Sequence, residues 1–157
     1  MSHRGFRNVV GLGLFFSLWS LVACGGAETG QRPMGDELRV EDAVAVAIPG
    51  GSTGAVYLTL LNPTETDDTL LKVSTPAARA AEVHETLEED GVLRMEAFPE
   101  GLPVPAGSRI ELAPGGKHVM LLALPEELVP GETLELTLHF DQAGPKTLTV
   151  PIRESVL

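Results

Sequence analysis

Short apolar segments separated by turn-forming residues make up the chain from Leu38 to Ile152. In segments such as 133–140 (Thr-Leu-Glu-Leu-Thr-Leu-His-Phe), apolar and polar residues alternate, which predicts β-strands with one buried face. Pro-Gly, Asp-Gly and Gly-Pro sequences between them favour tight turns. About nine strands are predicted, at 38–48, 55–61, 69–73, 81–87, 92–98, 109–112, 118–124, 133–140 and 146–152. The pattern indicates an all-β domain built as a sandwich or a barrel.

The composition is that of one folded domain. The chain has 157 residues, of which 43% are hydrophobic, and it contains 17 Gly and 12 Pro, which suits many short strands joined by turns. Its formal net charge is -11, and no basic stripe interrupts the acidic surface. Because binding to a phosphate backbone needs clustered cations, we expect no nucleic-acid partner. We expect a monomer.

The N-terminal segment has the features of a secretory signal. A short basic stretch precedes an apolar run over residues 9–23 that is too short to span a bilayer comfortably. The run ends in Leu-Val-Ala-Cys-Gly-Gly, which resembles the lipobox of bacterial lipoproteins, whose cysteine is lipidated. We predict a signal peptide at 1–23, lipidation of Cys24, a flexible tether at 24–37 and the folded domain at 38–157. The location is then periplasmic or otherwise extracytoplasmic, with the membrane reached only through the lipid anchor.

Several kinds of chemistry are excluded by the residues present. Cys24 is the one cysteine of the chain, so neither an intramolecular disulfide nor a Cys-based zinc site can form. A blue-copper centre is excluded because its thiolate ligand would have to lie on a strand, and no predicted strand contains a cysteine. No nucleophile elbow, phosphate-binding loop or HExxH helix occurs. The sequence therefore does not predict an enzyme.

Two histidines and two methionines on the predicted strands form pairs. His118 and Met120 are two residues apart, so their side chains share one face of a strand. His84 and Met95 flank an apparent hairpin with an Asp-Gly tip. A two-residue loop makes them diagonal neighbours, and a four-residue loop places them directly opposite each other. Both loops put the two side chains on one face, whereas a loop of odd length would separate them.

These side chains select a metal. Thioethers are soft and uncharged, so they suit Cu(I), which also accepts imidazole, and suit Zn²⁺, Mg²⁺ or Ca²⁺ poorly. They also tolerate an oxidising compartment better than thiolates do. A set of two nitrogen and two sulfur donors from His84, Met95, His118 and Met120 therefore points to Cu(I). His139 is expected to pack or hydrogen-bond structurally, and Met34 in the tether to be incidental.

The joint spacing of the four residues points to a family. They follow the pattern H-x10-M-x22-H-x-M, with one residue more in the long interval than a known H-x10-M-x21-H-x-M signature. Further matching landmarks are Asp42-Ala43, Gly54-Ala55-Val56-Tyr57, Asn62, Val83-His84-Glu85-Thr86, Val104-Pro105-Ala106-Gly107 and Pro114-Gly115-Gly116-Lys117-His118-Val119-Met120-Leu121. Over residues 38–152 the chain resembles the periplasmic copper chaperones called PCu(A)C, formerly a domain of unknown function.

The resemblance implies a cupredoxin-like or Greek-key β-barrel or sandwich with an exposed Cu(I) site of two His and two Met. Members of the PCu(A)C family supply copper to the dinuclear copper centre of cytochrome c oxidase. The resemblance therefore implies subunit II of the oxidase or a Sco-type protein as the acceptor. Some carry a His- and Met-rich tail; this sequence ends in Val156-Leu157, so a single site is expected.

Two other functions remain open at this point. The protein could be a metal-free envelope lipoprotein that binds a protein partner, or it could store copper for resistance with the same site.

Overall fold

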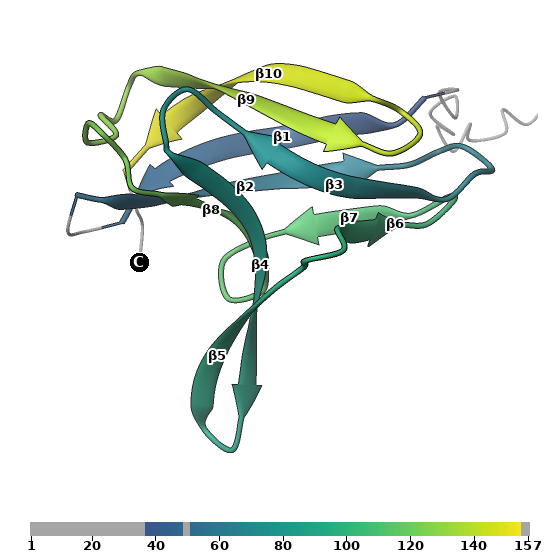
Figure 1. Cartoon of the computed structure of the whole chain (residues 1–157), viewed down its shortest axis with the longest axis horizontal. Coiled ribbons are helices and arrows are strands. Elements are labelled where there is room, and N and C mark those ends of the chain that lie inside the picture. Colours follow the sequence, from purple (N-terminus) through teal and green to yellow (C-terminus); the bar gives the residue numbers. More distant parts are fainter. Residues whose placement is uncertain (1–36, 49–50, 155–157) are drawn as a thin grey trace, which may run out of the picture. The chain divides into compact units, whose positions relative to one another are not determined.

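The computed structural model describes residues 37–48 and 51–154. In these residues the secondary structure consists of β-strands, without a helix (Figure 1). The strands are β1 (Arg39–Ala47), β2 (Thr53–Leu61), β3 (Asp68–Ser74), β4 (Ala80–Glu89), β5 (Val92–Ala97), β6 (Leu102–Val104), β7 (Arg109–Leu112), β8 (Lys117–Leu122), β9 (Thr133–Phe140) and β10 (Pro145–Arg153). The prediction of an all-β domain is confirmed.

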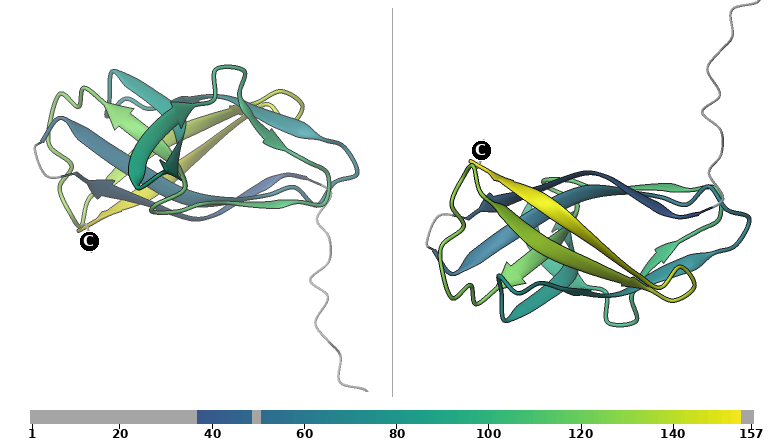
Figure 2. Two further views of the ribbon diagram at one scale, coloured as in Figure 1. Left: turned by 90° about the horizontal axis from the view of Figure 1, so that it is seen from below. Right: turned by 90° about the horizontal axis from the view of Figure 1, so that it is seen from above.

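The strands hydrogen-bond in the order β5-β4-β8-β2-β1-β10-β9-β3-β6, and β7 pairs with the remaining part of β2. Strands β5 and β6 end this order, so the sheet does not close into a barrel. Of the two predicted architectures, the sandwich is therefore correct. Figure 2 shows the β9–β10 hairpin lying obliquely between β1 and β3, which is where the pairing order puts it. The two layers are joined by the short parallel pairing of β1 with β10.

Alternating side chains from both layers build the core. Along β9 the residues Leu134, Leu136, Leu138 and Phe140 are all buried. Between them stand polar residues that are exposed or partly exposed, as the sequence pattern predicts. Strand β2 is buried on both faces over most of its length, because it is paired with β1 on one edge and with β8 and then β7 on the other. Each fully buried leucine contributes about 2 kcal/mol of hydrophobic stabilisation.

A β-bulge in β1 changes which residues face the core. The register with β2 shifts by one residue between Glu41 and Val44, and Asp42 there has a φ of 54°. An extra residue reverses the alternation, since the side-chain period of a strand is two. Accordingly Val40 packs against the core before the bulge, and Ala45 is buried after it.

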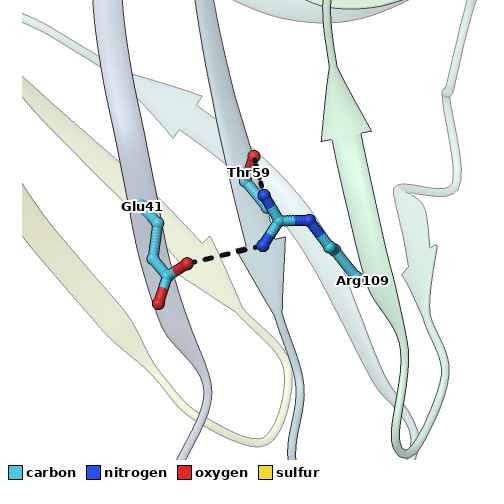
Figure 3. A network of polar contacts seen from close by, with 3 residues as sticks. All are labelled: Glu41, Thr59 and Arg109. Carbon is cyan, nitrogen blue, oxygen red and sulfur yellow. Dashed lines mark hydrogen bonds and ion pairs between the residues drawn. The ribbon is translucent and has the colours of Figure 1, made fainter.

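An arginine spans this part of the sheet. Arg109 of β7 reaches across β2 to the Glu41 carboxylate of β1 at 3.5 Å and to the Thr59 hydroxyl at 3.5 Å (Figure 3). The three side chains connect β7 to the bulged strand. At these distances and with an exposed arginine, the contribution to stability is small.

The sequence pattern missed β6. This strand has three residues, Leu102 to Val104, with Pro103 at its centre, which demotes a segment from a strand prediction. A proline is tolerated here because β6 is an edge strand that pairs with β3 alone. Leu102 and Val104, on either side of Pro103, are buried and extend the core.

The predicted signal peptide, Cys24 and the tether up to residue 36 lie outside the described residues. None of the described residues forms a helix that is long and apolar enough to cross a bilayer.

Candidate metal centre

The β4–β5 hairpin settles the register that the sequence left open. Glu89 pairs with Val92, and the two residues between them, Asp90 and Gly91, have φ values of 53° and 78°. Positive φ at both positions is typical of a two-residue type I′ turn, which matches the twist of the strands. The shorter of the two predicted loops is therefore correct.

With this register, Met95 is the diagonal neighbour of His84. His84 pairs with Ala97 and Thr86 pairs with Met95, so all four side chains lie on the same face of the hairpin. The predicted co-location of His84 and Met95 on one face is present in the structure.

Strand β8 brings the other pair of side chains beside them. His118 of β8 is directly opposite His84 of β4, and Met120 is opposite Glu82. The two imidazole rings meet edge to face, with their centroids 6.1 Å apart and an angle of 67° between the planes. Nothing in the sequence pattern indicated that β4 pairs with β8. The four candidate ligands thus lie on one face of three adjacent strands, β5, β4 and β8.

This face is the outer one. The residues of β4 and β8 that alternate with the histidines, Val83 and Val119, pack in or against the core on the opposite face. Exposure within the site is graded. His118 is 9% exposed and the side chain of His84 15%, whereas Met95 at the sheet edge is 61% exposed. The imidazoles therefore form the fixed part of the site and Met95 the accessible part.

Each imidazole has one nitrogen engaged and the other free. The Gly116 carbonyl accepts a hydrogen bond of 3.0 Å from Nδ1–H of His118, because a carbonyl oxygen can only accept. Nε2–H of His84 donates to the Glu82 carboxylate at 2.9 Å, and Nδ1 of His84 is buried without a partner. In metal-binding histidines, an acceptor on one ring nitrogen orients the other toward the ion.

The Gly116 carbonyl also holds the neighbouring strand. It accepts a second hydrogen bond of 3.1 Å from the Thr86 amide of β4. The loop before β8 turns at Gly115, which has a φ of 78°. One carbonyl of this loop therefore fixes both the His118 ring and the part of β4 opposite Met95.

The donor set fits a soft cation. The Nδ1 atom of His84 is buried without a hydrogen-bond partner, and the centroid of the His118 ring lies 6.1 Å from that of His84. Within 37–48 and 51–154, no three His, Cys, Asp or Glu side chains group as a metal site. Met95 and Met120 lie on the same face as the two histidines, so their thioethers could complete the coordination, which favours Cu(I) over harder ions.

The remaining candidates lie elsewhere or act structurally. His139 on β9 shares a 3.0 Å hydrogen bond between its Nε2 and the Ser74 hydroxyl of β3, so its predicted structural role is confirmed. The buried Asn62 side-chain amide donates to the Val104 and Thr66 carbonyls and organises the turn after β2. Tyr57 of β2 is partly buried, and this burial raises the pKa of its hydroxyl, which therefore stays neutral. Met34 is outside the described residues.

Solved structures with the same architecture include a PCuAC domain and a Cu(I)-bound protein. The apo PCuAC domain from PmoF1 is 28% identical, with a TM-score of 0.63 over 76% of this chain and 95% of that one. The Cu(I) form of DR1885 from Deinococcus radiodurans is 26% identical, with a TM-score of 0.63 over 81% of this chain and 87% of that one. The fold is thus that of a PCuAC domain.

The sequence comparison gives the family. Residues 38–152 match the family described as "Putative lipoprotein LpqE-like", and the chain belongs to it. It is 30% identical to "Putative lipoprotein Lxx21020" of Leifsonia xyli subsp. xyli, over 119 residues that make up 76% of this chain and 71% of that protein.

Proposed function

We propose that this protein is a lipid-anchored, extracytoplasmic Cu(I) chaperone that carries one ion on His84, Met95, His118 and Met120. The observation that carries the proposal is the convergence of these four side chains on one face of β5, β4 and β8. The likeness to a PCuAC domain and to DR1885, which was solved with Cu(I), supports it. The role is transport of the ion, and no substrate is converted.

Transfer would proceed by ligand exchange. Met95 lies on an edge strand and is 61% exposed, so an acceptor can approach it from solvent. As a ligand of the acceptor arrives, the Met95 thioether is the donor that leaves first, because the two imidazoles are held by hydrogen bonds. The ion passes between proteins without being released into water.

The acceptor in this proposal is the copper-binding part of cytochrome c oxidase, reached directly or through a Sco-type protein. Lipidation at Cys24 would keep the domain at the membrane surface, with residues 24–37 as a tether. The match to a family and a relative described as lipoproteins supports this anchoring.

An anaerobic Cu(I) titration against a chromogenic chelator tests the site. The wild-type protein should bind one equivalent. The Met95→Leu/Met120→Leu double variant should bind at least about 100-fold more weakly, because two soft ligands are replaced by side chains of similar volume that cannot coordinate. His139→Ala serves as the control and should bind as tightly as the wild type. Equal affinity of the double variant would remove the proposal.

Delivery and storage use the same site and differ in what becomes of the copper. Deleting the gene should lower the copper content of the oxidase at limiting copper if the protein delivers the ion. Loss of copper tolerance with a fully loaded oxidase would instead indicate storage.

A further inference from the structure

Glu82 makes a contact with the candidate site that the four-residue signature does not include. It lies two residues before His84 on β4, so both side chains project from the same face of the sheet. Its Oε2 atom is 2.9 Å from Nε2 of His84. It is also the cross-strand partner of Met120, which places a carboxylate directly beside two of the proposed ligands.

This contact fixes the tautomer of the His84 ring. An ionised carboxylate only accepts hydrogen bonds, so Nε2 must carry the proton. A neutral imidazole has one N–H, and Nδ1 is therefore left with a lone pair. That atom is buried and has no hydrogen-bond partner. A buried acceptor without a partner is destabilising, and a bound ligand would remove that penalty.

The opposite ring is arranged the other way round. His118 uses Nδ1–H to bond the Gly116 carbonyl, so its free nitrogen is Nε2. The two rings lie edge to face across the β4–β8 pair, His84 with its Nε2 hydrogen-bonded and His118 with its Nδ1 hydrogen-bonded.

We propose that Glu82 is a positioning residue that makes His84 bind the ion through Nδ1, while His118 binds it through Nε2. The inference rests on the proposed function and adds a coordination mode and a residue to it. By itself, the contact between Glu82 and His84 would contribute little to stability, since the Glu82 side chain is half exposed and solvent screens such pairs. An acceptor that orients a metal-binding imidazole typically contributes 10- to 100-fold in metal affinity.

The test reads the protonation of each ring nitrogen by long-range ¹H–¹⁵N NMR of the labelled full chain. Before copper is added, His84 should carry its proton on Nε2 and His118 on Nδ1. Anaerobic addition of one equivalent of Cu(I) should then shift the Nδ1 resonance of His84 and the Nε2 resonance of His118. Finding the proton of His84 on Nδ1, or the copper-induced shift on its Nε2, would overturn the inference.

Three variants separate the hydrogen bond from the charge. Glu82→Ala removes the acceptor and should weaken Cu(I) binding about 10- to 100-fold. Glu82→Gln keeps an acceptor oxygen and should recover most of this loss. Glu88→Ala removes the same charge from the same face of β4, beyond reach of His84, and should have little effect. Equal losses in Glu82→Ala and Glu88→Ala would show a general effect of charge and contradict the inference.

Failure of the two proposals can be told apart. A wild-type protein that takes up no Cu(I) contradicts the chaperone function and the inference with it. Uptake of Cu(I) with His84 bound through Nε2 contradicts the inference alone and leaves the chaperone function standing.

Discussion

At the scale of single residues, the proposed ligands divide into held and accessible groups. His118 is buried and hydrogen-bonded, so its ring is oriented before any ion arrives. Met95 is mostly exposed, so its thioether is accessible from solvent. A carrier needs both properties, because the held ligands give affinity and the accessible one permits exchange.

Moving the accessible thioether should therefore weaken copper binding without affecting folding. In the Leu93→Met/Met95→Leu double variant, the number of sulfur atoms and the strand face are unchanged, but the thioether is displaced two residues along β5, or about 7 Å. We expect the Kd for Cu(I) to rise at least about tenfold, measured by chelator competition.

The free energy of unfolding, from denaturant titration, should stay within about 0.5 kcal/mol of the wild type, because both positions are exposed. Wild-type affinity in this variant would show that any sulfur on the hairpin suffices, and would contradict the assignment of Met95.

At the scale of elements, the β4–β5 hairpin is the part most specific to the proposed function. It projects from the other strands in Figure 1, and every residue of β5 is exposed. Strand β5 is thus held by its pairing with β4 and by the turn between them. Elements with so few buried contacts open at low cost in free energy.

The turn should accordingly matter for copper more than for overall stability. Gly91→Val forces a β-branched residue into a φ of 78°, which costs about 1–2 kcal/mol and should distort the hairpin. We expect weaker Cu(I) binding and loss of the cross-strand NOEs between β4 and β5.

Gly144→Val is the matched control. This glycine has a φ of 71° in the β9–β10 turn, with open space around it as at Gly91. Its substitution should lower the free energy of unfolding by a similar amount and leave Cu(I) affinity unchanged. If both variants bound copper equally well, the hairpin turn would have no part in the site.

Strand prediction from the sequence succeeded where the information is local. The alternation of apolar and polar residues along β9 predicts a strand from neighbouring residues alone. In the same way, the Asp-Gly pair predicts the turn of the β4–β5 hairpin. The alternation of side chains along two strands joined by a loop of even length was enough to predict that His84 and Met95 lie on one face. Strand β6 was missed because Pro103 at its centre is the usual sign against a strand, and only the edge position in the finished sheet explains it.

The pairing of β4 with β8 could not be read from the pattern, because it joins segments far apart in the sequence. The same holds for the contact of Glu82 with His84, which depends on side-chain rotamers and on the direction of the free ring nitrogen. Sequence spacing therefore supplied the candidate ligands, whereas the geometry that unites them needed the structure.

At the scale of the folded domain, core and site lie on opposite faces of the same strands. Val83 and Val119 pack inward while His84 and His118 face outward, so the domain can be folded before copper arrives. A preformed site of this kind suits a protein that must be stable both with and without its cargo.

The most direct test of this account is X-ray absorption spectroscopy at the copper edge of the Cu(I)-loaded protein. We predict two nitrogen and two sulfur neighbours, and loss of the sulfur contribution in the Met95→Leu/Met120→Leu variant. A copper environment of nitrogen and oxygen alone, or one that keeps its sulfur neighbours in that variant, would contradict the four-residue site.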